Sequence, residues 1–265
     1  MQDDSSPDGK SGRSEFLPPF SRWRFAATAA AAIVAAMAVF TLFPVLDLAV
    51  SAYFYSPGLE SWDDGEWSCR AYSLACHPIL SPVRDLLHGL PFALGGILLV
   101  VTLWRAFRLR DIFERQVLRY AAAFWALIVG NMLLVETLLK QNWGRPRPYH
   151  QHIELERFAD YVFMPVGDWR GACTSNCSFA SGEAYALFWM VCATAVLPER
   201  WRRLAFWIAL PVAIFGALLR VAFGAHYLSD VTVAALLAVL VFSLFAMLAA
   251  AIERWWLSRK AATTA

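Results

Sequence analysis

A cluster of positive and protonatable side chains follows a long apolar run in the middle of the chain. The stretch LLKQNWGRPRPYHQH, residues 138–152, contains Lys140, Arg145, Arg147, His150 and His152. Lysine and arginine at a membrane edge commonly anchor a helix, but this cluster is larger than anchoring requires. The stretch therefore predicts a site for a negatively charged group.

Further ionisable residues lie at the ends of other apolar segments: Glu183, Arg220, His226 and Asp230. If each apolar segment crosses the membrane once, these residues and Lys140 lie at one depth on one side. Ionisable groups at membrane depth normally face the bundle interior and mark function. Each residue alone has an ordinary interpretation as an anchor or a helix cap. Their convergence favours a single site.

The residue types in this set suit a phosphate group. Lys140, Arg147 and Arg220 supply fixed positive charges, and guanidinium groups donate paired hydrogen bonds to phosphate oxygens. Ser181 and Gly182 precede a predicted helix, where exposed backbone N–H groups bind anions. We therefore expect all five to contact phosphate.

His226 and Asp230 have the spacing of a nucleophile and its partner. Residues four apart share one face of a helix. A carboxylate bonded to one imidazole nitrogen fixes the tautomer and leaves the other nitrogen free to attack. Gly224 allows the chain to bend, so that Arg220 and His226 can point into one pocket.

Apolar segments must position these residues. The 265-residue chain is 59% hydrophobic and 17% charged, with a mean hydropathy of +0.48, whereas soluble domains carry about 25% charged residues. A bilayer-spanning helix needs about 20 residues, so the two shorter segments depend on flanking residues. We predict an all-α, polytopic membrane protein, a helical bundle with about six transmembrane helices. They cover residues 25–46, 87–104, 120–139, 184–197, 204–223 and 231–252.

The basic residues predict the orientation. With a cytoplasmic N-terminus, the inner segments hold 15 of the 23 Lys and Arg residues but only 8 of the 21 Asp and Glu residues. Lys and Arg accumulate in short cytoplasmic loops. We expect a disordered cytoplasmic tail, a six-span domain and a second cytoplasmic tail, with the site on the extracytoplasmic face of the inner cell membrane. The inner segments are 1–24, 105–119, 198–203 and 253–265, and the domain is 25–252.

Most of the cysteines fall in the predicted outer loops, namely Cys69, Cys76, Cys173 and Cys177. An oxidising exterior favours disulfides, either Cys69 with Cys76 and Cys173 with Cys177 or pairs between the two loops. A zinc site that includes His77 is the alternative, although the spacings match no standard zinc finger.

Within residues 140–230 the chain resembles the type-2 phosphatidic acid phosphatases, which share a superfamily with the vanadium haloperoxidases. Their first motif is Lys, six residues, then Arg-Pro. Here Lys140 is followed after six residues by Arg147-Pro148. A second Arg-Pro pair begins at Arg145, but the six-residue gap selects Arg147.

The other two family motifs match less completely. The third is Ser-Arg, five residues, His, three residues, Asp. Both gaps are kept in Arg220, His226 and Asp230, while Leu219 replaces the serine. The second motif is Pro-Ser-Gly-His. Residues 180–183 read ASGE, so Glu183 stands where the family has histidine.

The resemblance implies a membrane phosphatase with a helical-bundle core. His226 would be the nucleophile that forms a phosphohistidine, and Asp230 would orient it. Cations and backbone groups would stabilise the developing charge on the phosphate, so neither a metal nor another cofactor is needed. The phosphate-binding residues would be Lys140, Arg147, Ser181, Gly182 and Arg220.

The glutamate at the second motif leaves the general acid open. In the family, the histidine there protonates the leaving oxygen. Glu183 could do so only when protonated, which burial favours and nearby cations oppose. His150 or His152 could be the acid instead. Alternatively, Glu183 pairs with an arginine to position it, or the leaving group is good enough to need no acid.

The leading hypothesis is an integral-membrane lipid phosphatase. Candidate substrates are phosphatidic acid, phosphatidylglycerol phosphate, a polyprenyl diphosphate and lipid A. The acidic, cysteine-bearing first loop and the SGE variant incline toward lipid A or a polyprenyl lipid. The alternatives are a lipid-to-lipid phosphotransferase and a non-catalytic lipid or anion binder with a degenerate site. The short basic inner loops do not suggest nucleic-acid binding.

Overall fold

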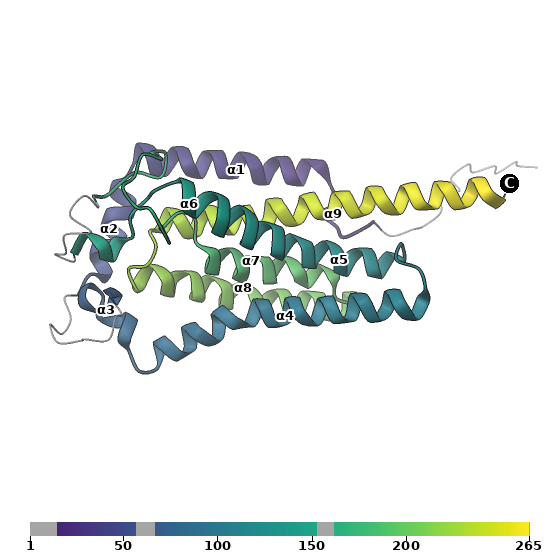
Figure 1. Ribbon diagram of the computed structural model, residues 1–265, viewed down its shortest axis with the longest axis horizontal. Coiled ribbons are helices and arrows are strands. Elements are labelled where there is room, and N and C mark those ends of the chain that lie inside the picture. Colours follow the sequence, from purple (N-terminus) through teal and green to yellow (C-terminus); the bar gives the residue numbers. More distant parts are fainter. Residues whose placement is uncertain (1–14, 57–66, 153–161, 265) are drawn as a thin grey trace, which may run out of the picture.

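Figure 1 shows the computed structural model of the chain, which describes residues 15–56, 67–152 and 162–264. Long helices run side by side in one bundle, and the described residues include no β-strand. The prediction of an all-α fold is confirmed. The helices are α1 (Trp23–Leu42), α2 (Val45–Phe54), α3 (Trp67–Ala71), α4 (Leu80–Leu109), α5 (Arg115–Leu127), α6 (Lys140–Asn142), α7 (Gly182–Ala193), α8 (Glu199–Ala222) and α9 (Leu228–Thr264).

The helix that carries Lys140 is longer than α5 alone. A π-helical segment, η2 (Ile128–Leu139), joins α5 to α6, so residues 115–142 form one rod with a wider middle. Segments of π-helix are rare and frequently occur at functional sites. Lys140 lies in the first turn after this segment, at the end of the rod that reaches the site.

Five of the described helices are long and apolar enough to cross a membrane. They correspond to the predicted spans at 25–46, 87–104, 120–139, 204–223 and 231–252. The predicted span at 184–197 differs. It forms α7 and a short 3₁₀ turn that ends at Val196, about 22 Å of helix at 1.5 Å per residue. That length falls short of a hydrocarbon core of about 30 Å.

Helix α7 is short because it lies inside the bundle. It packs against α4, α5, α8 and α9, and most of its side chains are buried. The polar tips of its large aromatic residues are satisfied within the protein. Tyr185 donates to the carbonyl of Ala126 at 2.8 Å, and the Trp189 indole donates to that of Ala123 at 2.7 Å. The continuous apolar character of α7 therefore reflects burial in protein.

The chain termini depart from the predicted tails. Residues 1–14 of the expected disordered tail lie outside the described residues. Further along that segment, Phe16 and Leu17 are buried and join the main apolar core. At the other end, α9 continues to Thr264, so the described part of the expected tail at 253–265 is helical.

The two ends of the bundle have different characters. Ion pairs connect the predicted inner segments at one end, with Arg115 3.6 Å from Glu253 and Lys260 3.2 Å from Asp111. The C-terminus and the connection between α4 and α5 lie at this end (Figure 1). Helices α2, α3 and α6 lie at the opposite end, where six of the predicted site residues line one cavity.

Candidate active site

A cavity of about 650 Å³ opens at the α6 end of the bundle, and we call it the site cavity. It contains six of the residues predicted from sequence: Lys140, Arg147, Gly182, Glu183, Arg220 and His226. The rest of its described lining was not predicted and consists of Arg84, His88, Phe92, Asn131, Met132, Glu136 and Asn176. Four cationic side chains and two carboxylates face this space, so it has an excess of positive charge that suits a phosphate.

His226 is held in one tautomer. Its Nδ1 lies 2.7 Å from the carbonyl oxygen of Ser178, and a carbonyl only accepts, so Nδ1 carries the proton. Nε2 is then the unprotonated nitrogen. Burial, together with the nearby positive charges of Arg147 and Arg220, lowers the pKa of His226 to about 3. The imidazole is therefore neutral at physiological pH, the state that a nucleophile requires.

Asp230 does not bond to the imidazole as the spacing suggested. Its Oδ2 is 3.8 Å from His226 Nδ1, too far for a hydrogen bond. Helix α9 begins at Leu228, so the two residues do not share a helical face. Asp230 instead accepts from the hydroxyl of Ser178 and from the backbone N–H of Tyr227. It fixes the loop that carries the imidazole and supplies a negative charge nearby.

Arg145 anchors the same loop without lining the site cavity. Its guanidinium is fully buried and pairs with Asp230 and with Asp47 of α2. The Asp47 carboxylate also accepts from the backbone N–H and the hydroxyl of Ser229, at 2.8 and 2.6 Å. Asp47 and Ser229 were not predicted as site residues. Arg147, which the six-residue gap selects, lines the site cavity, and Arg145 does not.

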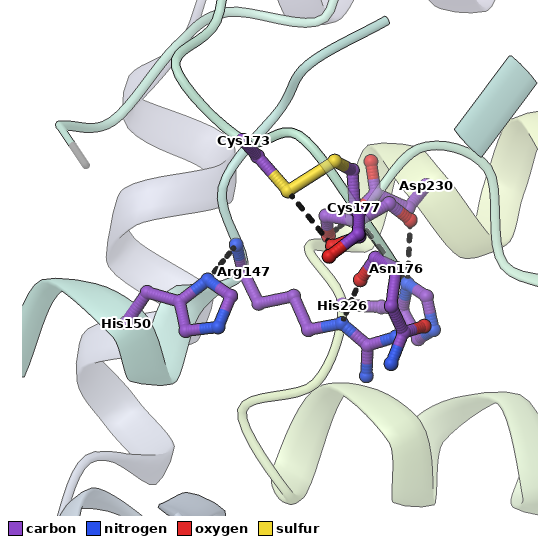
Figure 2. The surroundings of a disulfide bond; sticks show 9 residues. Arg147, His150, Cys173, Asn176, Cys177, His226 and Asp230 are labelled. Carbon is purple, nitrogen blue, oxygen red and sulfur yellow. Dashed lines mark hydrogen bonds and ion pairs between the residues drawn. A yellow bond between two sulfur atoms is a disulfide. The ribbon is translucent and has the colours of Figure 1, made fainter. Parts of the chain in front are cut away.

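Arg147 is positioned by a disulfide-closed loop (Figure 2). Cys173 and Cys177 are bonded, and Asn176 between them accepts from Arg147 through its backbone carbonyl, at 2.9 Å, and through its side-chain oxygen. Asn176 has a φ of 48°, a left-handed conformation that asparagine tolerates better than most residues. The loop therefore fixes the guanidinium beside His226.

The other predicted cysteines also pair within their own loop. Cys69 and Cys76 are bonded, with 5.5 Å between their Cα atoms. Sulfurs bonded to each other cannot serve as thiolate ligands, so this loop does not form the alternative zinc site with His77. Among the described residues, no cluster of histidine, cysteine and carboxylate side chains is placed to hold a metal ion.

Lys140 is held by a carboxylate one helical turn earlier. Its ammonium donates to both oxygens of Glu136, at 2.7 and 2.9 Å. The backbone of Gly182 lies directly beyond. A side chain at Gly182 would place its first carbon 1.9 Å from Glu136 Oε1. The second-motif glycine thus leaves room for the carboxylate that positions Lys140.

Ser181 does not line the site cavity. It is fully buried, and its hydroxyl accepts from the backbone N–H of Ala184 at 3.3 Å. This is an ordinary N-cap contact. The beginning of α7 nevertheless faces the cavity through Gly182 and Glu183. Asn131 of η2 fixes this helix start by donating to the carbonyl of Gly182 at 2.6 Å.

Glu183 pairs with two arginines. Arg84 of α4 contacts both carboxylate oxygens, with 3.0 Å from its Nε to Oε2. The Nε of Arg220 lies 3.3 Å from Oε1. Two adjacent guanidinium groups stabilise an ionised carboxylate. The contacts therefore favour the positioning role for Glu183 over the role of proton donor.

His150, one of the two histidines considered as the acid, lies outside the site cavity. His150 Nδ1 accepts from the backbone N–H of Arg147 at 3.2 Å, and His150 does not line the site cavity. Figure 2 shows its ring at the backbone end of Arg147, with Asn176 at the guanidinium end. The side chain of His152 lies outside the described part of the structure.

The residues that the sequence prediction missed lie outside the family motifs. Arg84 precedes the span predicted at 87–104, His88 lies at the beginning of that span, and Asn176 lies in a loop. One pattern in the sequence could have indicated them. Arg84, His88 and Phe92 are each four residues apart, so they share one face of α4, and all three line the site cavity. Similarly, Glu136 lies four residues before Lys140.

The bundle and the cavity define a helical membrane protein in which cations surround a neutral histidine. Residues 119–254 match the model of the PAP2 superfamily. The chain therefore belongs to this superfamily. It is a membrane phosphatase, a phosphoric monoester hydrolase of the PAP2 type.

Relatives with similarity over most of the chain carry a more specific name. The chain is 33% identical over 229 residues to the lipid A 4'-phosphatase of Rhizobium leguminosarum, covering 79% of this chain and 89% of that protein. It is 32% identical to the Rhizobium etli protein of that name, covering 79% and 81%. Identity to the one from Francisella tularensis subsp. novicida is 29%, covering 72% and 81%. No solved structure shows significant similarity.

Proposed function

We propose that this membrane lipid phosphatase removes a phosphate from a lipid A-type glycolipid through a phosphohistidine on His226. The observation that carries the proposal is the gathering of Lys140, Arg147 and Arg220 with His226 around one cavity. These residues come from α6, from two loops and from α8, so ordinary membrane anchoring does not account for their meeting.

The proposed chemistry has two steps. Nε2 of His226 attacks phosphorus, the bond to the lipid oxygen breaks, and its electron pair leaves with that oxygen. Lys140, Arg147 and Arg220 compensate the charge that develops on the other phosphate oxygens. Water then attacks phosphorus, the P–N bond breaks, and inorganic phosphate leaves. The Ser178 carbonyl and the Asp230 charge support the positive imidazole ring of the intermediate.

The substrate class rests on two observations. The relatives that cover most of the chain are lipid A 4'-phosphatases. The site cavity, at about 650 Å³, also has room for a phosphorylated sugar rather than a bare phosphate. Lipid tails would remain in the bilayer while the head group reaches the cavity.

The proposed location follows from charge and from the positions of the ends. The basic inner segments meet at the end of the bundle that lacks the site cavity. With these segments in the cytoplasm, both termini lie inside and the site opens on the extracytoplasmic face of the inner membrane. The two disulfides belong to the site end, where an oxidising compartment would preserve them.

The test is phosphate release from a panel of lipids by the purified protein in detergent. The panel contains lipid A, phosphatidic acid, phosphatidylglycerol phosphate and a polyprenyl diphosphate. We expect the fastest release from lipid A and a loss of about 1,000-fold or more in His226→Ala. Binding of lipid A without release would support the non-catalytic alternative. Transfer of phosphate to a second lipid would support the phosphotransferase, and a full rate in His226→Ala would overturn the mechanism.

A further inference from the structure

Helix α4 presents an unassigned histidine to the site cavity. His88 lines the cavity together with His226 and is half-exposed. Its Nδ1 lies 3.8 Å from Oε1 of Glu183, and its ring packs edge-on against Phe92 at a centroid distance of 5.7 Å. The carboxylate therefore faces one ring nitrogen, which leaves Nε2 as the nitrogen able to meet a ligand.

The reaction requires a proton donor at this position. A lipid oxygen that leaves as an alkoxide is a poor leaving group, and a positioned acid typically accelerates such a step by about 10²–10⁴-fold. Glu183 is paired with Arg84 and Arg220, which keeps it ionised. Imidazole is the side chain that most often transfers protons near neutral pH.

We propose that His88 is the general acid of this phosphatase. The inference rests on the proposed phosphohistidine chemistry and deepens it. The α4 imidazole would act in place of the absent second-motif histidine, with the negative charge of Glu183 3.8 Å from its Nδ1. Glu183 is then a positioning residue for His88, as well as for Arg84 and Arg220.

Protons balance through the cycle. As Nε2 of His226 attacks and the P–O bond breaks, Nε2 of His88 donates its proton to the leaving lipid oxygen, and the lipid departs as an alcohol. His88 is now neutral. The water that attacks the phosphohistidine releases one proton to solvent, His88 regains its proton from solvent, and the P–N bond breaks. The electron pair of that bond returns to His226, and both histidines regain their starting states.

The test compares leaving groups in wild type and His88→Gln. Lipid A has an alkyl leaving oxygen that needs a proton, whereas 4-nitrophenyl phosphate releases a stable phenolate that does not. We expect His88→Gln to lower kcat for lipid A by about 100-fold or more and to change turnover of the aryl ester by less than about threefold. The matched control is His77→Gln, an exposed loop histidine outside the cavity, for which both activities should stay within about twofold of wild type.

Chemical rescue supplies a second measurement. Because His88 is half-exposed, free imidazole should enter the space left in His88→Gly. It should raise the lipid turnover of that variant at least about tenfold. Equal losses for both substrates, the absence of rescue, or unchanged lipid turnover in His88→Gln would each overturn the assignment. A wild-type protein inactive toward every lipid would instead overturn the proposed function and this inference with it.

Discussion

The charge state of a single imidazole decides whether the site can act. His226 is 2% exposed and lies beside Arg147 and Arg220. Burial and these positive charges keep it neutral, and the Ser178 carbonyl fixes the proton on Nδ1. The nucleophile is thus prepared by its surroundings without a direct hydrogen bond from Asp230.

The first prediction concerns the pH dependence of stability. The pKa of His226 is about 3 when folded and about 6.5 when unfolded. As pH falls below 6.5, the unfolded chain binds a proton that the folded protein does not, so stability decreases. Between pH 7.5 and 5 this loss amounts to about 2 kcal/mol.

The variant His226→Asn has no group that titrates at this position, so it serves as the reference for wild type. The melting temperature in detergent, measured at both pH values, should fall further for wild type than for His226→Asn. A difference between the two proteins that stays constant with pH would contradict the neutral, buried imidazole.

The second prediction concerns Glu183→Gln. The amide leaves the buried Arg220 without a carboxylate and Arg84 with Asp85 alone, which costs about 3 kcal/mol, so the melting temperature should fall. Because Glu183 positions other groups rather than donating a proton, about a tenth of the lipid turnover should remain. Turnover as low as in His226→Ala, at an unchanged melting temperature, would identify Glu183 as a reacting group.

The sequence predicted that several charged residues would meet, because their spacing and their membrane depth agreed. Lys140, Arg147, Arg220 and His226 meet in one cavity as expected. Ser181 caps its own helix instead of facing the cavity. A hydroxyl just before a helix can either cap that helix or contact a bound anion, and the sequence does not distinguish the two. His88 was not predicted as a site residue, because its contact with Glu183 joins residues 95 positions apart in the sequence.

At the scale of elements, one buried ion cluster connects the pieces that form the site. Arg145 lies between Asp47 of α2 and Asp230 of α9, and neither its side chain nor those of its partners is exposed. Burying these charges is unfavourable, and their mutual attraction offsets the loss of hydration only when all the partners are present. The cluster therefore fixes the loop before α9, which carries His226.

The third prediction is that Arg145→Met destabilises the protein by about 3–5 kcal/mol, because it leaves Asp47 and Asp230 buried without their cation. Denaturant or thermal unfolding in detergent measures this loss. The matched control is Arg170→Met, which removes an exposed pair with Asp168 and should leave the unfolding transition close to that of wild type, because exposed ion pairs contribute little to stability. Similar effects of the two substitutions would show that the buried cluster is not structural.

Helix positions followed from apolar runs, but their surroundings did not. The predicted spans all became helices, yet α7 is covered by α4, α5, α8 and α9 rather than by lipid. Lipid and a protein interior are both apolar, so composition does not distinguish them. Only length separates the two cases, and the predicted segment 184–197 was already short.

The whole molecule is polarised along the bundle axis. The site cavity and both disulfide loops lie at one end, and the basic connections with the C-terminus lie at the other (Figure 1). The orientation expected from charge thus assigns each end of the bundle to a compartment. The sequence could predict that the basic segments lie at the end opposite the site. The excess of Lys and Arg is summed over whole segments and does not depend on any single contact.

The fourth prediction tests the orientation by labelling. Ser56 lies at the site end and Thr263 at the other, and both are exposed. In cells with a permeable outer layer, a membrane-impermeant maleimide should label Ser56→Cys directly and Thr263→Cys only after the inner membrane is opened. Wild type controls for Cys192, which is buried, and for the disulfide cysteines. The reverse labelling pattern would place the site in the cytoplasm.

The most direct measurement is the capture of the intermediate. Protein mixed with lipid A carrying radioactive phosphate is quenched within milliseconds in alkali, where phosphohistidine survives, and is then digested and sequenced. We predict label on the peptide that contains His226 and no label in His226→Asn. Label on another residue, or full turnover in which no labelled protein forms at any time, would contradict a mechanism in which His226 receives the phosphate.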